Sequence, residues 1–183
     1  MNRFLVLLMI VFFGFLSCKN AEETEDKLKI TQQYFDALNQ SDASQIQELI
    51  ADSLLTIVPK YNYQLKFSKT DYLENWLKWD AKFEPTYEIL EMNLENESVK
   101  AKVVKTDKRI LFLMQKPFET METLHFQNNK IVAVSTEYLN FDTETWEKNK
   151  TELLNWSAKN HPELKLNQFI NIQTEAGGEN FRI

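Results

Sequence analysis

Three stretches in the first half of the chain carry apolar residues at helical spacing. In Lys27–Asn39 these residues recur at i, i+4 and i+8, which predicts an amphipathic helix. Asp42 has capping-box spacing to a glutamine three residues on, which predicts a second helix that ends near Asp52. Ser68 caps a third predicted helix, and Pro85 terminates it. The apolar face of this third helix is largely aromatic and consists of Tyr72, Trp76, Trp79 and Phe83.

Between and after these helices, apolar residues alternate with polar ones or form short runs, as they do in β-strands. Asn128 and Asn129 tolerate positive φ angles and predict a tight turn before the last strand. Arg109–Met114 and Phe118–Gln127 form one bent strand or two, with Pro117 at the break. The other predicted strands are Leu54–Val58, Tyr61–Phe67, Thr86–Leu94, Ser98–Lys105 and Ile131–Leu139.

A last helix is predicted over Thr143–Asn160, with Asp142 as its cap. One face of this helix carries its large apolar residues, Trp146, Leu153 and Trp156. Leaving large apolar side chains in water forfeits roughly 1.5–3 kcal/mol for each. We therefore expect residues 141–183 to pack on the preceding domain, beside the sheet or across its open end as a lid. The alternative is that this face awaits a partner protein.

Helices that precede a run of antiparallel strands indicate an α+β fold. The order of the elements resembles that of the NTF2-like superfamily, including SnoaL-like domains. Three local features add to this resemblance: the opening Tyr34-Phe35-Asp36-Ala37-Leu38-Asn39, the strand ending at Pro59 and the hairpin Asn128-Asn129-Lys130-Ile131. This resemblance covers residues 27–140. It implies a cone in which a curved antiparallel sheet wraps round three N-terminal helices and encloses a pocket, with the last helix as an addition. The competing fold is a cystatin-like sheet that grips one helix.

The first 26 residues have the pattern of a targeting segment followed by a tether. Phe4–Leu16 is an apolar run of 13 residues behind a basic start, which is too short to span a bilayer but fits a signal peptide. Ser17-Cys18 at its end resembles the lipobox of Bacteroidetes-type lipoproteins. The resemblance implies a signal peptide over residues 1–17, a lipidated Cys18 and an acidic tether over 18–26. The chain would then be anchored in the outer membrane, facing the periplasm or the cell surface. An ordinary signal peptide beside a chance cysteine is the alternative.

Composition excludes several classes of function. With 21 Lys+Arg against 27 Asp+Glu, the net charge of −6 argues against nucleic acid as a partner. The phosphate-binding loops of P-loop and Rossmann proteins need glycine, and residues 15–176 contain none. A zinc site normally needs several His or Cys ligands, whereas the chain has two His and one Cys. A serine or cysteine hydrolase needs a nucleophile with a His base in reach, and Cys18 is lipidated on this interpretation, which leaves only His125 and His161. We therefore expect no metal and no cofactor.

The remaining chemistry is that of carboxylates inside the cone. Alternation along the strands predicts that Glu122 and Glu88 point inward, where burial would raise their pKa and suit them to acid or base catalysis. Tyr34, Tyr138 and Trp76 are predicted to line the same pocket. The purely structural alternative is that Glu122 pairs with a cation on a neighbouring strand, for which the candidates are Lys100, Lys102 and Arg109.

Two functions fit these observations. The first is non-catalytic binding of a small apolar ligand or of a protein partner, with a homodimer formed through the sheet as one form of the latter. The second is a small-molecule isomerase, cyclase or hydratase that uses a pocket carboxylate. Ketosteroid isomerase-like members of the superfamily carry a catalytic Asp shortly after the first strand, but Pro59–Gln64 contains no acid. That difference favours binding.

Overall fold

The computed structural model describes residues 25–169 and 173–181. Its first helix spans residues 25–40 and is followed by α2 (Ala43–Leu49), with Asp42 as the predicted cap. A third helical segment starts at Ser68, whose hydroxyl accepts a 3.0 Å hydrogen bond from the backbone N–H of Asp71. This segment changes helical type along its length, through α3 (Lys69–Asp71), the π-helical turn η2 (Tyr72–Leu77) and α4 (Lys78–Ala81).

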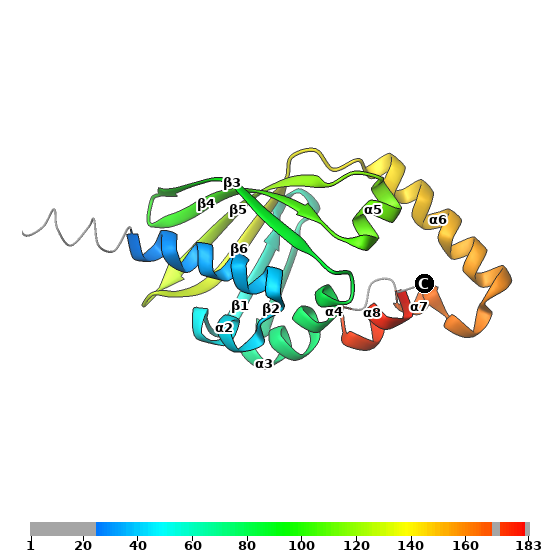
Figure 1. Cartoon of the computed structure of the whole chain (residues 1–183), viewed down its shortest axis with the longest axis horizontal. Coiled ribbons are helices and arrows are strands. Elements are labelled where there is room, and N and C mark those ends of the chain that lie inside the picture. The colour runs from blue at the N-terminus through cyan, green and yellow to red at the C-terminus, as the bar shows by residue number, and fades with distance from the viewer. Residues whose placement is uncertain (1–24, 170–172, 182–183) are drawn as a thin grey trace, which may run out of the picture.

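Six strands form one curved sheet in the order β2-β1-β6-β5-β4-β3, and the helix of residues 25–40 lies across its concave side (Figure 1). Neighbouring strands are antiparallel except β1 and β6, which pair in parallel. The fold is therefore the α+β cone that the sequence predicts, with one parallel pairing in place of a wholly antiparallel sheet. The strands are β1 (Ile50–Val58), β2 (Tyr63–Ser68), β3 (Thr86–Glu95), β4 (Ser98–Thr106), β5 (Phe118–Gln127) and β6 (Lys130–Tyr138).

Two apolar clusters fill the space between the helices and the sheet. The larger one joins the first and third helices to the sheet, and its buried members include Phe35, Leu38, Leu54, Leu77, Val103, Leu124 and Ile131. The smaller one lies at the other end of β5 and β6 and consists of Ile110, Met114 and Phe118, with Tyr138, Phe141 and Trp146 packed against them. Asn39 ties the first helix to β3, because its side chain exchanges two hydrogen bonds with the backbone of Tyr87.

The prediction that Arg109–Met114 is a strand is wrong. These residues belong to α5 (Lys108–Met114), and the carboxylate of Asp107 accepts a 2.5 Å hydrogen bond from the N–H of Ile110 as its N-cap. Gln115 ends the helix with a φ of 61°. A short apolar run has no periodicity that separates strand from helix, so only the cap could have shown the difference.

The C-terminal segment consists of α6 (Thr143–Asn160), η3 (Pro162–Leu164), α7 (Leu166–Phe169) and α8 (Glu175–Phe181). Near its start, α6 is held by the side-chain amide of Asn149, which donates a 2.8 Å hydrogen bond to the carbonyl of Leu113. Its far end projects away from the sheet (Figure 1), and Trp156 stays 46% exposed. The expectation that the whole apolar face of this helix is buried is therefore wrong at Trp156.

The helix α8 packs closely on α4. A Cβ at Gly178 would lie 2.9 Å from the Cγ of Lys82 and 3.1 Å from the carbonyl oxygen of Trp79, so glycine permits this approach. Lys82 also forms ion pairs with Glu175 and Glu179 at 3.1 Å and 2.5 Å. These contacts connect the last described helix to the third helical segment of the cone.

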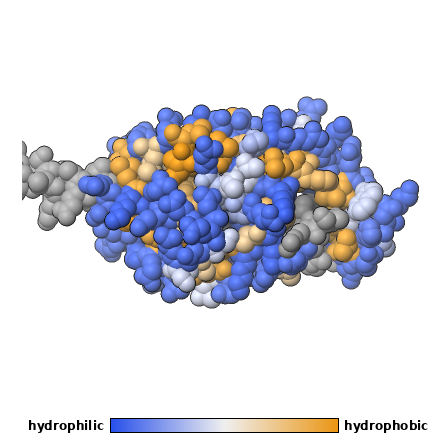
Figure 2. Space-filling view, in the orientation of Figure 1, coloured by the Kyte–Doolittle hydropathy of each residue, from blue (hydrophilic) through white to orange (hydrophobic). Residues whose placement is uncertain are grey.

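Apolar surface gathers along the upper part of the view in Figure 2, over β3 and beside α5. The exposed large apolar residues of those elements are Leu90, Leu111 and Phe112. In the part of the chain that the structure describes, no helix has the length and apolarity of a membrane span. The predicted signal segment and Cys18 lie outside the described residues.

Candidate functional site

A polar band crosses the inner face of the sheet between the two apolar clusters. On β5 the inward positions run from Phe118 in the smaller cluster to Leu124 in the larger one, and the two positions between them are Thr120 and Glu122. On β6, Thr136 lies directly opposite Glu122. The prediction that Glu122 points inward agrees with this register, and the band places one carboxylate among apolar and aromatic side chains.

Glu122 retains some contact with solvent, although protein surrounds its carboxylate closely. Burial raises the pKa of Glu122, and a 2.6 Å hydrogen bond donated by the Thr136 hydroxyl opposes this rise without cancelling it. The Thr120 hydroxyl also lowers this pKa, although it forms no hydrogen bond of good geometry. Weak attraction from Lys105 acts in the same direction.

Two buried tyrosines lie near this carboxylate and are hydrogen-bonded to each other. The hydroxyl oxygens of Tyr34 and Tyr72 are 2.6 Å apart. Burial raises the pKa of both phenols, and the negative charge of Glu122 raises it further, so both stay protonated at neutral pH. Trp76 stacks on Tyr72 with ring centroids 4.8 Å apart. Both rings belong to the π-helical turn η2, a distortion often found at functional sites.

A buried ion pair lies beside Trp76 of this site, and sequence reasoning missed it. Asp80 is 1% exposed and accepts hydrogen bonds from the Tyr87 hydroxyl at 2.6 Å and the Lys105 ammonium at 2.9 Å. The Lys105 nitrogen also lies 4.7 Å from the centroid of the Tyr87 ring. The sequence does indicate the inward position of Lys105, because this residue continues the inward alternation of Val99, Ala101 and Val103.

Tyr138 borders the polar band on the side of the smaller cluster. Its ring packs edge-on against Phe118 and Tyr61, with centroids 5.4 Å and 5.7 Å apart, and burial and the charge of Glu122 raise its pKa. Next to this ring, Tyr63 and Leu65 on β2 share the inner face with Phe67, yet they are 42% and 39% exposed. The helices therefore leave the inner face uncovered at β2.

We name the group formed by Glu122, Thr136, Tyr34, Tyr72, Trp76 and Tyr138 the Glu122 cluster. Four of its six members, Glu122, Tyr34, Tyr138 and Trp76, are among the residues that the sequence pattern assigns to a pocket. Thr136 and Tyr72 are the other two, and the sequence pattern assigns Tyr72 only to the aromatic face of the third helix.

Glu88 does not belong to this cluster, and the prediction that it points inward is wrong. A bulge in β3 at Leu90 shifts the register between Ile89 and Glu91. Simple alternation back from Met92 therefore fails, so that Tyr87 and Ile89 face the core while Glu88 is exposed. The suggested cations do not pair with Glu122 either. Their observed partners are Glu95 for Lys100, Glu119 for Lys102 and Asp107 for Arg109.

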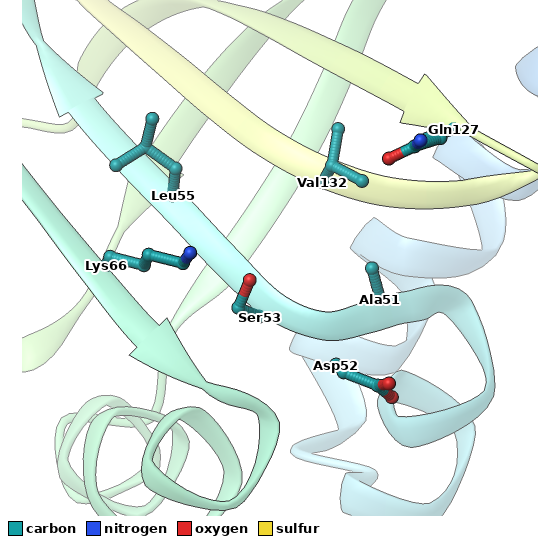
Figure 3. A pocket seen from close by; sticks show the side chains of 7 residues that line it. All are labelled: Ala51, Asp52, Ser53, Leu55, Lys66, Gln127 and Val132. Carbon is teal, nitrogen blue, oxygen red and sulfur yellow. The ribbon is translucent and has the colours of Figure 1, made fainter.

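A hollow of about 410 Å³ lies on the opposite, outer face of the sheet (Figure 3). It opens where the β1–β6 pairing shifts register between Ile50 and Leu55. Figure 3 shows Leu55, Ser53 and Lys66 on one side and Val132 and Gln127 on the other. Its walls come from exposed or half-exposed outer positions. Among residues 25–169 and 173–181, no group of three or more potential metal ligands occurs.

No protein-family model matches the chain, and no curated protein resembles it closely enough to count as a relative. Several solved structures do resemble the chain. An epoxide hydrolase of the LEH-like type from M. tuberculosis superposes with a TM-score of 0.55 at 10% identity, over 69% of this chain and 90% of that one. An NTF2-like protein of unknown function from Burkholderia xenovorans gives 0.51 at 13% identity, over 68% and 91%.

The fold is NTF2-like. A ketosteroid isomerase candidate from Kribbella flavida also superposes, with a TM-score of 0.54 at 15% identity over 66% of this chain and 82% of that one. The three similar proteins thus carry different descriptions on one fold, and at this identity the likeness establishes the fold alone.

Proposed function

We propose that the domain binds a small, largely apolar molecule on the concave face of the sheet, with Glu122 as the group that recognises its polar end. One observation carries this proposal: Glu122 lies between two apolar clusters with its carboxylate facing inward, and the residue is only partly covered by the rest of the protein. A buried carboxylate costs free energy unless its hydrogen-bonding capacity is used. Among the described residues, the hydrogen bond of good geometry to Glu122 is that of Thr136, so oxygen lone pairs remain for a ligand.

Aromatic side chains supply the apolar part of this proposed site. Tyr138 and Trp76 are half-buried members of the Glu122 cluster, and Tyr61 and Tyr63 are exposed at the uncovered side near β2. Rings of this kind offer large contact areas at little cost in side-chain entropy. A molecule that enters beside β2 would place its apolar body against these rings and its polar end toward Glu122.

Acid–base catalysis by Glu122 is the second candidate, and the raised pKa of its carboxyl favours it. The neighbouring polar groups argue for binding instead. Tyr34 and Tyr72 are bonded to each other, and Asp80 is engaged by Tyr87 and Lys105. A proton-transfer reaction usually needs a second acid or base in reach of the substrate.

The test is a screen of the purified full chain against small apolar molecules by thermal shift and native mass spectrometry. We expect stabilising ligands whose binding weakens in Glu122→Gln. Lys66→Met in the outer hollow is the matched control and should leave binding unchanged. A ligand that the Glu122→Gln variant binds but no longer converts would favour catalysis. Binding that only Lys66→Met weakens would place the ligand on the outer face and contradict the proposal.

We also propose that the chain is a lipoprotein of the cell envelope, anchored through Cys18. The support is the apolar run Phe4–Leu16 followed by Ser17-Cys18. Two or three acyl chains supply at least the two signals that stable anchoring requires. Mass spectrometry of the protein from membranes should find an acylated Cys18 as the first residue. A Cys18→Ala variant that stays in the membrane fraction would refute the anchor and leave the ligand proposal untouched.

A further inference from the structure

The charges around Glu122 do not balance. Two cations lie close enough to act on the site, and each already has its own carboxylate. Lys105 pairs with Asp80 at 2.9 Å, and Arg109 pairs with Asp107 at 3.1 Å. Both of these acids are almost fully buried, so the pairs are firmly placed. Among the residues that the structure describes, no Lys, Arg or His forms an ion pair with Glu122. When Glu122 ionises, its negative charge is the one left uncompensated.

The surroundings of Glu122 are rich in aromatic rings, which present a negative potential on their faces. Tyr34, Tyr72 and Tyr138 are all close enough for the charge of Glu122 to act on their hydroxyls. Trp76 stacks on Tyr72, and Tyr61 packs against Tyr138 at the uncovered side. Rings combined with a single carboxylate attract an organic cation more strongly than a neutral molecule of the same shape.

The chain already places its own cations over such rings. The Lys105 nitrogen lies over the rings of Tyr87 and Trp76, at 4.7 Å and 6.0 Å from their centroids. The guanidinium carbon of Arg109 lies 4.5 Å from the ring centroid of Trp79 and 4.9 Å from that of Phe83. Among these contacts of the cone interior, none places a cation over the ring of Tyr138.

We propose that the ligand of the Glu122 cluster carries a positive charge: an organic cation whose ammonium group pairs with Glu122 and whose apolar body lies against Tyr138 and Trp76. This inference rests on the proposed binding function and specifies its ligand class. A protonated amine can donate a hydrogen bond to the remaining lone pairs of Glu122, and a quaternary amine pairs with it through charge alone. Both are attracted by the carboxylate and by the ring faces. An anionic ligand would meet the uncompensated charge of Glu122 and is disfavoured.

The experiment compares two probes that differ in one atom. Para-hydroxyphenyl-trimethylammonium and para-tert-butylphenol have the same shape, but an ammonium nitrogen in the first replaces a quaternary carbon in the second. Isothermal titration of the full chain should give a Kd about tenfold lower for the cation, as expected for combined ring and carboxylate attraction. Glu122→Gln keeps the side-chain shape and should remove this preference. Glu88→Gln, on the exposed side of β3, should preserve it.

Three results would overturn the inference. The neutral probe could bind as tightly as the cation, the preference could survive Glu122→Gln, or neither probe could bind. In the first case a small apolar molecule still binds, so the proposed function stands without its charged ligand. In the second case Glu122 is not the group that selects the cation, and the screen with Glu122→Gln decides the proposed function separately. Where neither probe binds, the screen of neutral apolar molecules decides the proposed function separately. A melting curve of Glu122→Gln that matches or exceeds the wild type shows that a lost preference does not come from unfolding.

Discussion

Thr136 and Glu122 face each other across the β5–β6 pair, and the hydroxyl of the first donates a 2.6 Å hydrogen bond to the carboxylate of the second. A hydrogen bond to the charged form of an acid stabilises that form. Thr136 therefore lowers a pKa that burial raises, and it keeps the carboxylate of Glu122 oriented along the inner face of the sheet. The charge state of this glutamate depends on the balance of these two effects.

Thr136→Val should raise the pKa of Glu122 further, because valine keeps the shape of the side chain and removes the donor. We expect the free energy of unfolding to fall by about 1 kcal/mol for the lost hydrogen bond. Carboxyl carbon NMR over a pH titration measures the pKa directly. Thr123→Val is the control, since Thr123 pairs with Ser135 on the outer face. A Glu122 pKa that is equal in the two variants would show that Thr136 does not act on the carboxylate.

Stability should depend on pH through Glu122. Its folded-state pKa lies above that of an ordinary glutamate, so the folded protein binds this proton more tightly than the unfolded chain does. The resulting stabilisation is fully present below the unfolded-state pKa of about 4.3 and is lost as pH rises through the raised folded-state pKa. Glu122→Gln should therefore melt at a higher temperature than the wild type at neutral pH, and the gap should close in acid.

Glu88→Gln supplies the matched control for this pH series, because Glu88 is the other glutamate of a predicted pocket and is exposed. Its melting temperature should differ little from the wild type at any pH. A Glu122→Gln variant that is less stable than the wild type at neutral pH would contradict the expected sign of the effect. It would mean that the carboxylate receives more stabilisation from the folded protein than it loses through burial.

The inward positions of β5 and β6 could be predicted from sequence because both strands alternate without interruption through the polar band. Glu122, Thr136 and Tyr138 follow from this period of two alone. The prediction for Glu88 is wrong because the bulge at Leu90 reverses the alternation, and no residue type in β3 indicates a bulge. The ion pair of Asp80 and Lys105 joins a helix to a strand 25 residues later, a contact that only the tertiary fold creates.

Removing only one partner of the Asp80–Lys105 ion pair should strongly lower the free energy of unfolding. In Lys105→Met the buried carboxylate of Asp80 keeps the hydrogen bond from the Tyr87 hydroxyl but loses its counter-charge, and we expect a loss of about 3–5 kcal/mol in unfolding free energy. Asp80→Asn combined with Lys105→Met should recover part of this loss, because an amide carries no charge. Urea unfolding of the two single variants and the double variant forms the cycle that measures the coupling. Additive losses would show that the two groups do not interact.

The two tryptophans of α6 should behave differently, although the sequence assigns them to the same face. Trp146 packs on Phe141 with centroids 5.1 Å apart and lies 5.8 Å from the guanidinium of Arg109, whereas Trp156 is 46% exposed. Trp146→Ala should therefore lower the unfolding free energy by about 2–4 kcal/mol, since it empties part of the smaller cluster. Trp156→Ala should cost less than about 1 kcal/mol. Thermal and urea unfolding of the two variants make the comparison at constant chain length. Equal losses would mean that the far half of α6 is held as firmly as its start. Trp156 would then be buried in solution by a contact that one copy of the chain does not provide.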